Sequence, residues 1–102
     1  MIIYNVTCNV VLEAEKKWLD WIDLELNELS KSQKITATTI LKLDNNTPSE
    51  VAIYALQYYI SDQNTLQEFL KTEDQSLKKQ IKTQFGDAVL HFSSQLEIIK
   101  EY

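Results

Sequence analysis

The sequence predicts a ferredoxin-like α+β fold of order βαββαβ, a four-stranded antiparallel sheet with two helices on one face. The first observation is the hydrophobic period, which changes between two and 3.6 residues along the chain. The second is length, because 102 residues suit one domain, here 1–102, with one modest core. The expected strands are Ile2 to Val10, Ile35 to Leu43, Val51 to Ile60 and Leu90 to Ile99, and the expected helices are Ala14 to Leu29 and Leu66 to Phe85.

The first strand alternates between an apolar and a polar face. We expect the apolar face, with Tyr4, Val6 and Cys8, to pack on the helices. Asn5 and Thr7 then lie on the opposite face. One cysteine cannot form an internal disulfide, and the chain opens as a strand without a basic, signal-like segment. Both features favour a cytoplasmic location.

The first helix carries glutamates in its first turn, where negative charge suits the helix dipole. Its apolar stripe includes Trp18, Trp21 and Ile22 at spacings of three and four residues. We interpret the tryptophans as core anchors rather than a cofactor shelf.

The second strand is predicted to turn Ile35, Ala37, Leu41 and Leu43 toward the core and Thr36, Thr38 and Ile40 away from it. The segment from Asp44 to Ser49 is dense in turn-forming residues.

The third strand is apolar on both sides apart from Gln57. Two placements are therefore open for its uncovered face: a set with Gln57 and Tyr59, or the alternate set with Tyr54 and Tyr58. We favour the first, because Gln57 is the one polar residue of the strand interior.

The second helix has Thr65 and Glu68 at the spacing of a capping box, although Ser61 or Asp62 offers an earlier start. Its stripe is interrupted between residues 71 and 74, which predicts a kink or break. Gly86 follows the last apolar residue, where a C-terminal cap belongs.

The last strand is predicted to turn Leu90, Phe92, Leu96 and Ile98 toward the helices. Because crossover handedness puts both helices on one side, the uncovered face is expected to hold Asn5, Thr7, Asn9, Thr36, Thr38, Ile40, His91, Ser93, Gln95 and Glu97. A face exposed to water usually carries Lys and Glu. This mixed face instead favours a homodimer with sheets stacked face to face.

A small-molecule site between the two sheets is the sharper hypothesis, because pockets form at such junctions. The candidate binding or interface residues are Asn5, Thr7, Gln57, Tyr59, His91 and Gln95. His91, the one histidine, has no nucleophile at a signature spacing, so an interface role is favoured over acid or base catalysis.

Composition weighs against several other classes. The chain has 15 acidic residues against ten lysines and no arginine, so we expect no nucleic-acid partner. No apolar run approaches the length of a membrane helix. With a single His and a single Cys, we expect no metal site and no cofactor.

Four motifs occur in one order along the chain and together resemble a known family. They are Ile3-Tyr4-Asn5-Val6-Thr7-Cys8-Asn9-Val10, Trp18-Leu19-Asp20-Trp21, Gln57-Tyr58-Tyr59 and Phe85-Gly86-Asp87. The family consists of short bacterial proteins classed as a domain of unknown function, and it looks like a member of the dimeric α+β barrel superfamily, which includes antibiotic-biosynthesis-type monooxygenases. Family members tend to have His-Ile-Pro after the tryptophan helix, where this chain has Leu26-Asn27-Glu28.

Three hypotheses follow for function. The first is a homodimer that binds a small molecule between its sheets. The second, implied by the resemblance, is a cofactor-independent monooxygenase-like enzyme with His91, Tyr59 or Asn5 handling protons. The third is a module that pairs with a different protein chain.

Overall fold

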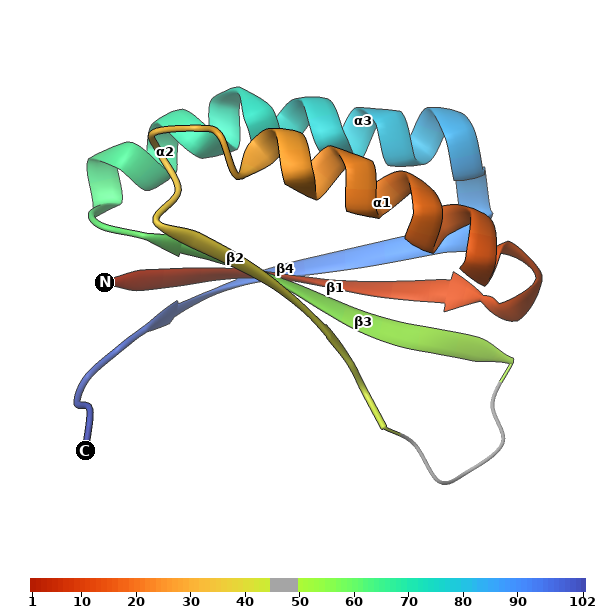
Figure 1. Cartoon of the computed structure of the whole chain (residues 1–102), viewed down its shortest axis with the longest axis horizontal. Helices are drawn as coiled ribbons and strands as arrows, with labels where there is room; N and C mark the ends of the chain where they lie inside the picture. Colours follow the sequence, from red (N-terminus) through yellow and green to blue (C-terminus); the bar gives the residue numbers. More distant parts are fainter. Residues whose placement is uncertain (45–49) are drawn as a thin grey trace.

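The computed structural model describes residues 1–44 and 50–102 and forms two layers, a sheet and a covering of helices (Figure 1). The predicted turn from Asp44 to Ser49 lies, beyond its first residue, outside the described residues. The strands are β1 (Ile2–Val11), β2 (Ala37–Lys42), β3 (Val51–Ile60) and β4 (Val89–Glu97); the helices are α1 (Glu15–Leu29), α2 (Gln63–Lys71) and α3 (Glu73–Phe85), with short 3₁₀ turns at Leu12–Ala14 and Gly86–Ala88.

The sheet is antiparallel throughout, in the order β2-β3-β1-β4. The two inner strands, β1 and β3, pair along their whole length, with Tyr4 opposite Tyr58 and Asn5 opposite Gln57. The helices cover one side of this sheet, and no element of the described chain covers the other (Figure 1). The predicted ferredoxin-like fold is confirmed.

The core lies between the sheet and the helices. Trp18 and Ile22 of α1 and Phe69 of α2 are fully buried against the even-numbered residues of β1 and β3. The aromatic rings contact one another: the Trp18 ring centroid is 5.1 Å from that of Tyr54, and the Phe69 centroid is 5.0 Å from that of Tyr58. Trp21 is half-buried and packs edge-on against Phe85.

Local signals explain where the helices begin and end. Asp62 caps α2 by accepting a hydrogen bond from the Thr65 backbone N–H at 2.8 Å, so the earlier of the two predicted starts is correct. The predicted break falls at Thr72, between α2 and α3. Gly86 ends α3 with a φ of 55°, a conformation that favours glycine.

The predicted orientation of β4 is wrong. In the observed register Leu90, Phe92 and Leu96 lie opposite Asn9, Thr7 and Ile3, so they share the uncovered face. His91, Ser93, Gln95 and Glu97 therefore lie on the helix side instead. The prediction assumed that the more apolar set of a strand must face the helices. That assumption fails for this edge strand, because the helices bury only Val89 of β4 and leave most of its other side chains exposed on both faces.

The predicted orientation of β2 is also wrong. Ala37, Thr39 and Leu41 lie opposite odd-numbered residues of β3, on the uncovered face, while Thr38 and Ile40 lie on the helix side. Ile35 is buried as expected, but it precedes the strand, so its direction does not set the alternation within β2.

The preferred orientation of β3 is confirmed. Tyr54 and Tyr58 are buried beneath the helices, and Gln57 and Tyr59 lie on the other face, half-buried.

The reactivity of the Cys8 thiol tests whether the core is packed as described. Its side chain has no exposed surface, and burial raises the pKa of the thiol to about 12, against a small opposing effect of the Lys78 charge. The folded chain at pH 8 is therefore expected to react with an aromatic disulfide reagent at least about a thousand-fold more slowly than the unfolded chain in guanidinium. A Leu24→Cys variant, with its thiol on an exposed position of α1, is the reactive control. Equal rates for Cys8 in the folded and unfolded chain would contradict this core.

Candidate functional site

The side chains that point away from the helices form what we call the open face. Because paired residues on neighbouring strands point to the same side of a sheet, the register gives the order of these side chains across the strands from β2 to β4. Three rows cross all four strands: Ala37, Tyr59, Ile3 and Leu96; Thr39, Gln57, Asn5 and Ser94; and Leu41, Ala55, Thr7 and Phe92.

The middle row is entirely polar and uncharged, and we call Thr39, Gln57, Asn5 and Ser94 the polar row. Its two central amides contact each other, with the Gln57 Nε2 donating to Asn5 Oδ1 at 3.3 Å. Asn5 Nδ2 in turn donates to the Thr7 hydroxyl at 3.0 Å. These bonds hold the amides on the sheet surface, half-buried by their neighbours.

The rows on either side of the polar row expose large apolar side chains. Phe92 is 59% exposed and Leu96 is 47% exposed on β4, and Leu41 is 46% exposed on β2. Leu90 adds to the same face beside Asn9. Large exposed apolar side chains gathered on one face are typical of an interaction site.

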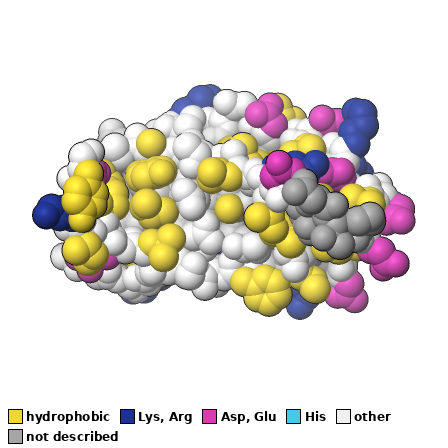
Figure 2. All heavy atoms as spheres, turned by 90° about the horizontal axis from the view of Figure 1, so that it is seen from below, with side chains coloured by type: hydrophobic (Ala, Val, Ile, Leu, Met, Phe, Trp, Pro, Cys, Tyr) yellow, Lys and Arg dark blue, Asp and Glu magenta, His cyan; other side chains and the backbone are white. Residues whose placement is uncertain are grey.

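The open face carries no charge among its described positions, although the chain has a formal net charge of −5. Figure 2 shows this face from below: apolar and uncharged groups fill its middle, and acidic and basic side chains gather at the rim. Charged residues are depleted in the same way at the centres of protein interfaces.

Four of the six predicted site residues lie on the open face and two do not. Asn5, Thr7, Gln57 and Tyr59 are there. His91 and Gln95 are not, because β4 has the opposite orientation. The structure therefore separates the three proton-handling candidates, with Asn5 and Tyr59 on one side of the sheet and His91 on the other.

His91 lies beside a hollow of about 340 Å³ at the edge of the sheet, next to Ile81 and Lys82 of α3. Partial burial lowers the pKa of its imidazole; the charge of Lys78 lowers it further, and Asp74 opposes both. These effects together favour the neutral form of the ring. No nucleophile or second titratable group is hydrogen-bonded to it in the described chain.

A buried polar cluster that the sequence analysis missed lies between α3 and the sheet. Lys78 Nζ is 3.0 Å from Asp74 Oδ2, donates to the Tyr4 hydroxyl at 2.6 Å and donates to Ser93 Oγ at 2.8 Å. Tyr4 donates to Asp74 Oδ2 at 3.2 Å. Asp74 is 4% exposed, and it is the one buried charged residue of the described chain. The spacing of Asp74 and Lys78, four residues apart on one helix face, was the available signal.

The chemistry of this cluster is structural. Burial acts to lower the pKa of Lys78, but the hydrogen bonds to Tyr4 and Asp74 and the charge of Asp74 together outweigh it, so that the pKa is raised. All three ammonium protons have acceptors. A charged and saturated lysine cannot take a proton from Ser93, so this serine is not an activated nucleophile.

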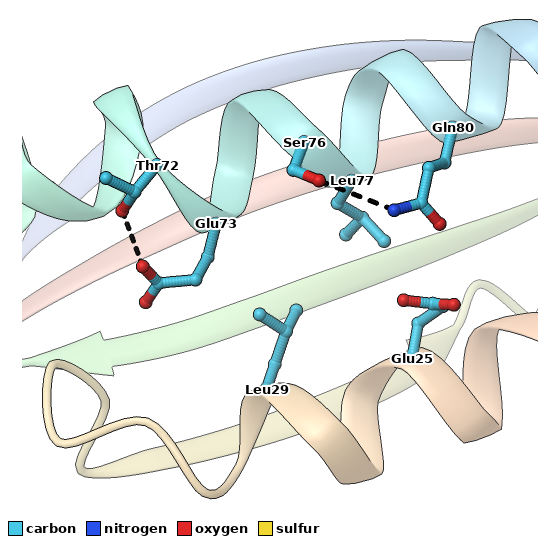
Figure 3. A pocket seen from close by; sticks show the side chains of 7 residues that line it. All are labelled: Glu25, Leu29, Thr72, Glu73, Ser76, Leu77 and Gln80. Carbon is cyan, nitrogen blue, oxygen red and sulfur yellow. Dashed lines mark hydrogen bonds between the residues drawn. The ribbon is translucent and has the colours of Figure 1, made fainter.

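A cleft of about 350 Å³ separates α1 from α3 on the outer layer (Figure 3). Leu29 and Leu77 line it, and Glu25 and Glu73 place carboxylates at its sides. Glu73 already accepts hydrogen bonds from Ser32 at 2.8 Å and Lys34 at 3.1 Å. Its partners tie α3 to the loop after α1, and Gln80 donates to the Ser76 hydroxyl at 3.4 Å on the α3 side of the cleft.

Within residues 1–44 and 50–102, no three His, Cys, Asp or Glu side chains come close enough to hold a metal ion. None of the helices in those ranges has the length and apolar character needed to cross a membrane.

The buried cluster is tested by removing its carboxylate. Asp74→Ala leaves the Lys78 ammonium partly buried without its counter-charge, and the free energy of unfolding is expected to fall by about 3 kcal/mol. The Asp74→Ala, Lys78→Met double variant is expected to recover part of this loss. Urea denaturation measures both. Asp23→Ala, at an exposed site on α1, is the control, and an equal effect there would refute the assignment.

Several solved structures share this fold at low sequence identity. A dimeric ferredoxin-like protein from an uncultured marine organism aligns with a TM-score of 0.75 and 14% identity, over 99% of this chain and 97% of that one. A Deinococcus radiodurans protein provisionally named an antibiotic biosynthesis monooxygenase aligns with a TM-score of 0.77 and 9% identity, over 100% and 96% of the chains. A Bacillus halodurans protein of the ethyl tert-butyl ether D family aligns with a TM-score of 0.69 and 14% identity, over 97% of this chain and 100% of that one.

A comparison with curated proteins gives no match. A family model described as a domain of unknown function, DUF4286, matches residues 1–99. The predicted resemblance is confirmed, and the chain belongs to the DUF4286 family.

Proposed function

We propose that two copies of this chain pair through their open faces and that the homodimer is the functional form. One observation carries the proposal: the whole described open face lacks charge and exposes Phe92, Leu90, Leu96 and Leu41 beside the polar row. Burial of apolar side chains at this density drives association.

The absence of charge on the open face allows a second copy to approach there. Two chains with a formal net charge of −5 each repel one another at long range. The uncharged face is where two copies can approach without placing like charges in contact. Two of the structural neighbours are named as dimeric ferredoxin-like proteins, which supports a dimer for this fold.

Binding of a small molecule between the paired sheets is the second candidate function. The hydrogen-bonding capacity that Asn5 and Gln57 leave unused favours it, because such groups orient ligands in otherwise apolar sites. A monooxygenase-like reaction has less support, since His91 lies on the other side of the sheet from Asn5 and Tyr59.

The homodimer is tested by light scattering coupled to size exclusion. The wild-type chain is expected at about twice its mass of 11.9 kDa at tens of micromolar. Phe92→Asp places a charge on the open face, and we expect the dissociation constant to rise on the order of 100-fold. Leu24→Asp is the matched control, because Leu24 is 66% exposed on α1, and it is expected to remain dimeric.

A monomeric wild-type chain at these concentrations would refute the proposal. So would equal loss of dimer in the Phe92→Asp and Leu24→Asp variants. Stoichiometric capture of a different chain by the wild type, abolished by Phe92→Asp, would show a hetero-interaction module instead.

A further inference from the structure

We propose that the polar row selects the alignment of the two copies, with the Asn5–Gln57 pair of one copy hydrogen-bonding to the same pair of the other. The inference rests on the proposed homodimer and adds its specificity-determining residues. The apolar rows supply the attraction, and the amides choose one arrangement among those that would bury the same apolar surface.

The position of the pair is the first step. Asn5 and Gln57 lie opposite each other on the two inner strands, β1 and β3, well inside both strands. A two-fold axis relates identical surfaces, so each residue near the axis meets its own copy or a close neighbour. A two-fold stacking whose axis passes close to this pair therefore brings the two Asn5–Gln57 pairs together, whatever the angle between the strands of the two copies.

The hydrogen-bonding inventory is the second step. Each side-chain amide has two N–H donors and a carbonyl oxygen with two lone pairs. Asn5 uses one N–H on Thr7 and one lone pair on Gln57, and Gln57 uses one N–H on Asn5. Each amide thus retains an N–H, and the Gln57 carbonyl has no hydrogen bond among the described residues. A group that offers donors and acceptors together is complementary to its own copy, which a row of like charges is not.

The energetic argument is the third step. A buried amide that loses water and finds no partner costs about 1–3 kcal/mol. If one copy slides by two residues along its strands, its polar row faces an apolar row that contains Phe92 or Leu96. Several unsatisfied donors and acceptors per dimer then oppose the slide. A single buried asparagine sets register and oligomeric state in coiled coils by this mechanism.

The test replaces the two amide side chains of the polar row with apolar ones and leaves the apolar rows unchanged. Asn5→Val, Gln57→Leu and the double variant are compared with Asn27→Val and Gln67→Leu, which make the same changes at exposed positions of α1 and α2. Each is made in a Cys8→Ala, Leu24→Cys background that carries a spin label on the outer face of α1. Pulsed electron spin resonance then measures the distance distribution between the two labels of a dimer, and light scattering measures the mass.

One narrow distance is expected for the starting protein and for both helix controls. The double variant of the polar row is expected to remain dimeric, with a dissociation constant within about tenfold of the starting value, and to show a broad or multiple distance distribution. Doubled amide signals in its ¹H–¹⁵N spectrum would report the same mixture of alignments.

Three results would overturn the inference while leaving the homodimer standing. The first is a single narrow distance in the double variant. The second is a monomeric double variant, which would show that the polar row contributes affinity rather than alignment. The third is a small molecule that co-purifies with the wild type in native mass spectrometry and is lost with Gln57→Leu. A monomeric starting protein would instead reject the homodimer itself.

Discussion

The pairing of β1 with β3 is the constraint on which the rest of the structure depends. These strands occupy the centre of the sheet and are paired along their full length. Because side chains alternate along a strand, this one register places Tyr4, Val6 and Cys8 beneath the helices together with Leu56 and Tyr58. The same register places Asn5 and Gln57 side by side on the other surface. A shift of one residue would exchange the two sets and destroy both faces.

Tyr4 belongs both to the aromatic core and to the polar cluster with Asp74 and Lys78. Its ring stacks near Tyr58 and meets Phe69 edge-on, and its hydroxyl joins Asp74 and Lys78. The tyrosine ring thus belongs to the aromatic core, while Asp74 Oδ2, the Lys78 ammonium and the Tyr4 hydroxyl bind one another; Asp74 Oδ1 is buried without a hydrogen-bond partner. Desolvated charges are tolerated only when they are paired and hydrogen-bonded, and this cluster meets most of that need with four side chains from three elements. It fixes α3 above β1 and β4.

The open face differs from the core mainly in what covers it within the described chain. Both surfaces of the sheet are rich in apolar side chains, but one is covered by helices of the same chain and the other is not. Homodimer interfaces resemble a domain core cut in half, with a few polar groups that set the alignment. The polar row between apolar rows fits this pattern. The rim of charge seen in Figure 2 then lies where two copies would meet water.

The sequence by itself determined the order of elements, the break and the C-terminal end of the second helical segment, and the faces of β1, and it favoured the correct face of β3. These rest on local physics: Gly86 adopts a positive φ, β1 alternates cleanly between an apolar and a polar face, and Gln57 is the one polar residue in the interior of β3. The tertiary structure alone decided the faces of the edge strands. In β2 both alternating sets contain apolar residues, and in β4 the more apolar set lies on the uncovered face, so the pattern of an edge strand does not fix its orientation; the pairing with β1 and β3 does. That pairing moved Phe92 and Leu90 onto the open face and removed His91 from it, because register is a property of two strands and not of one.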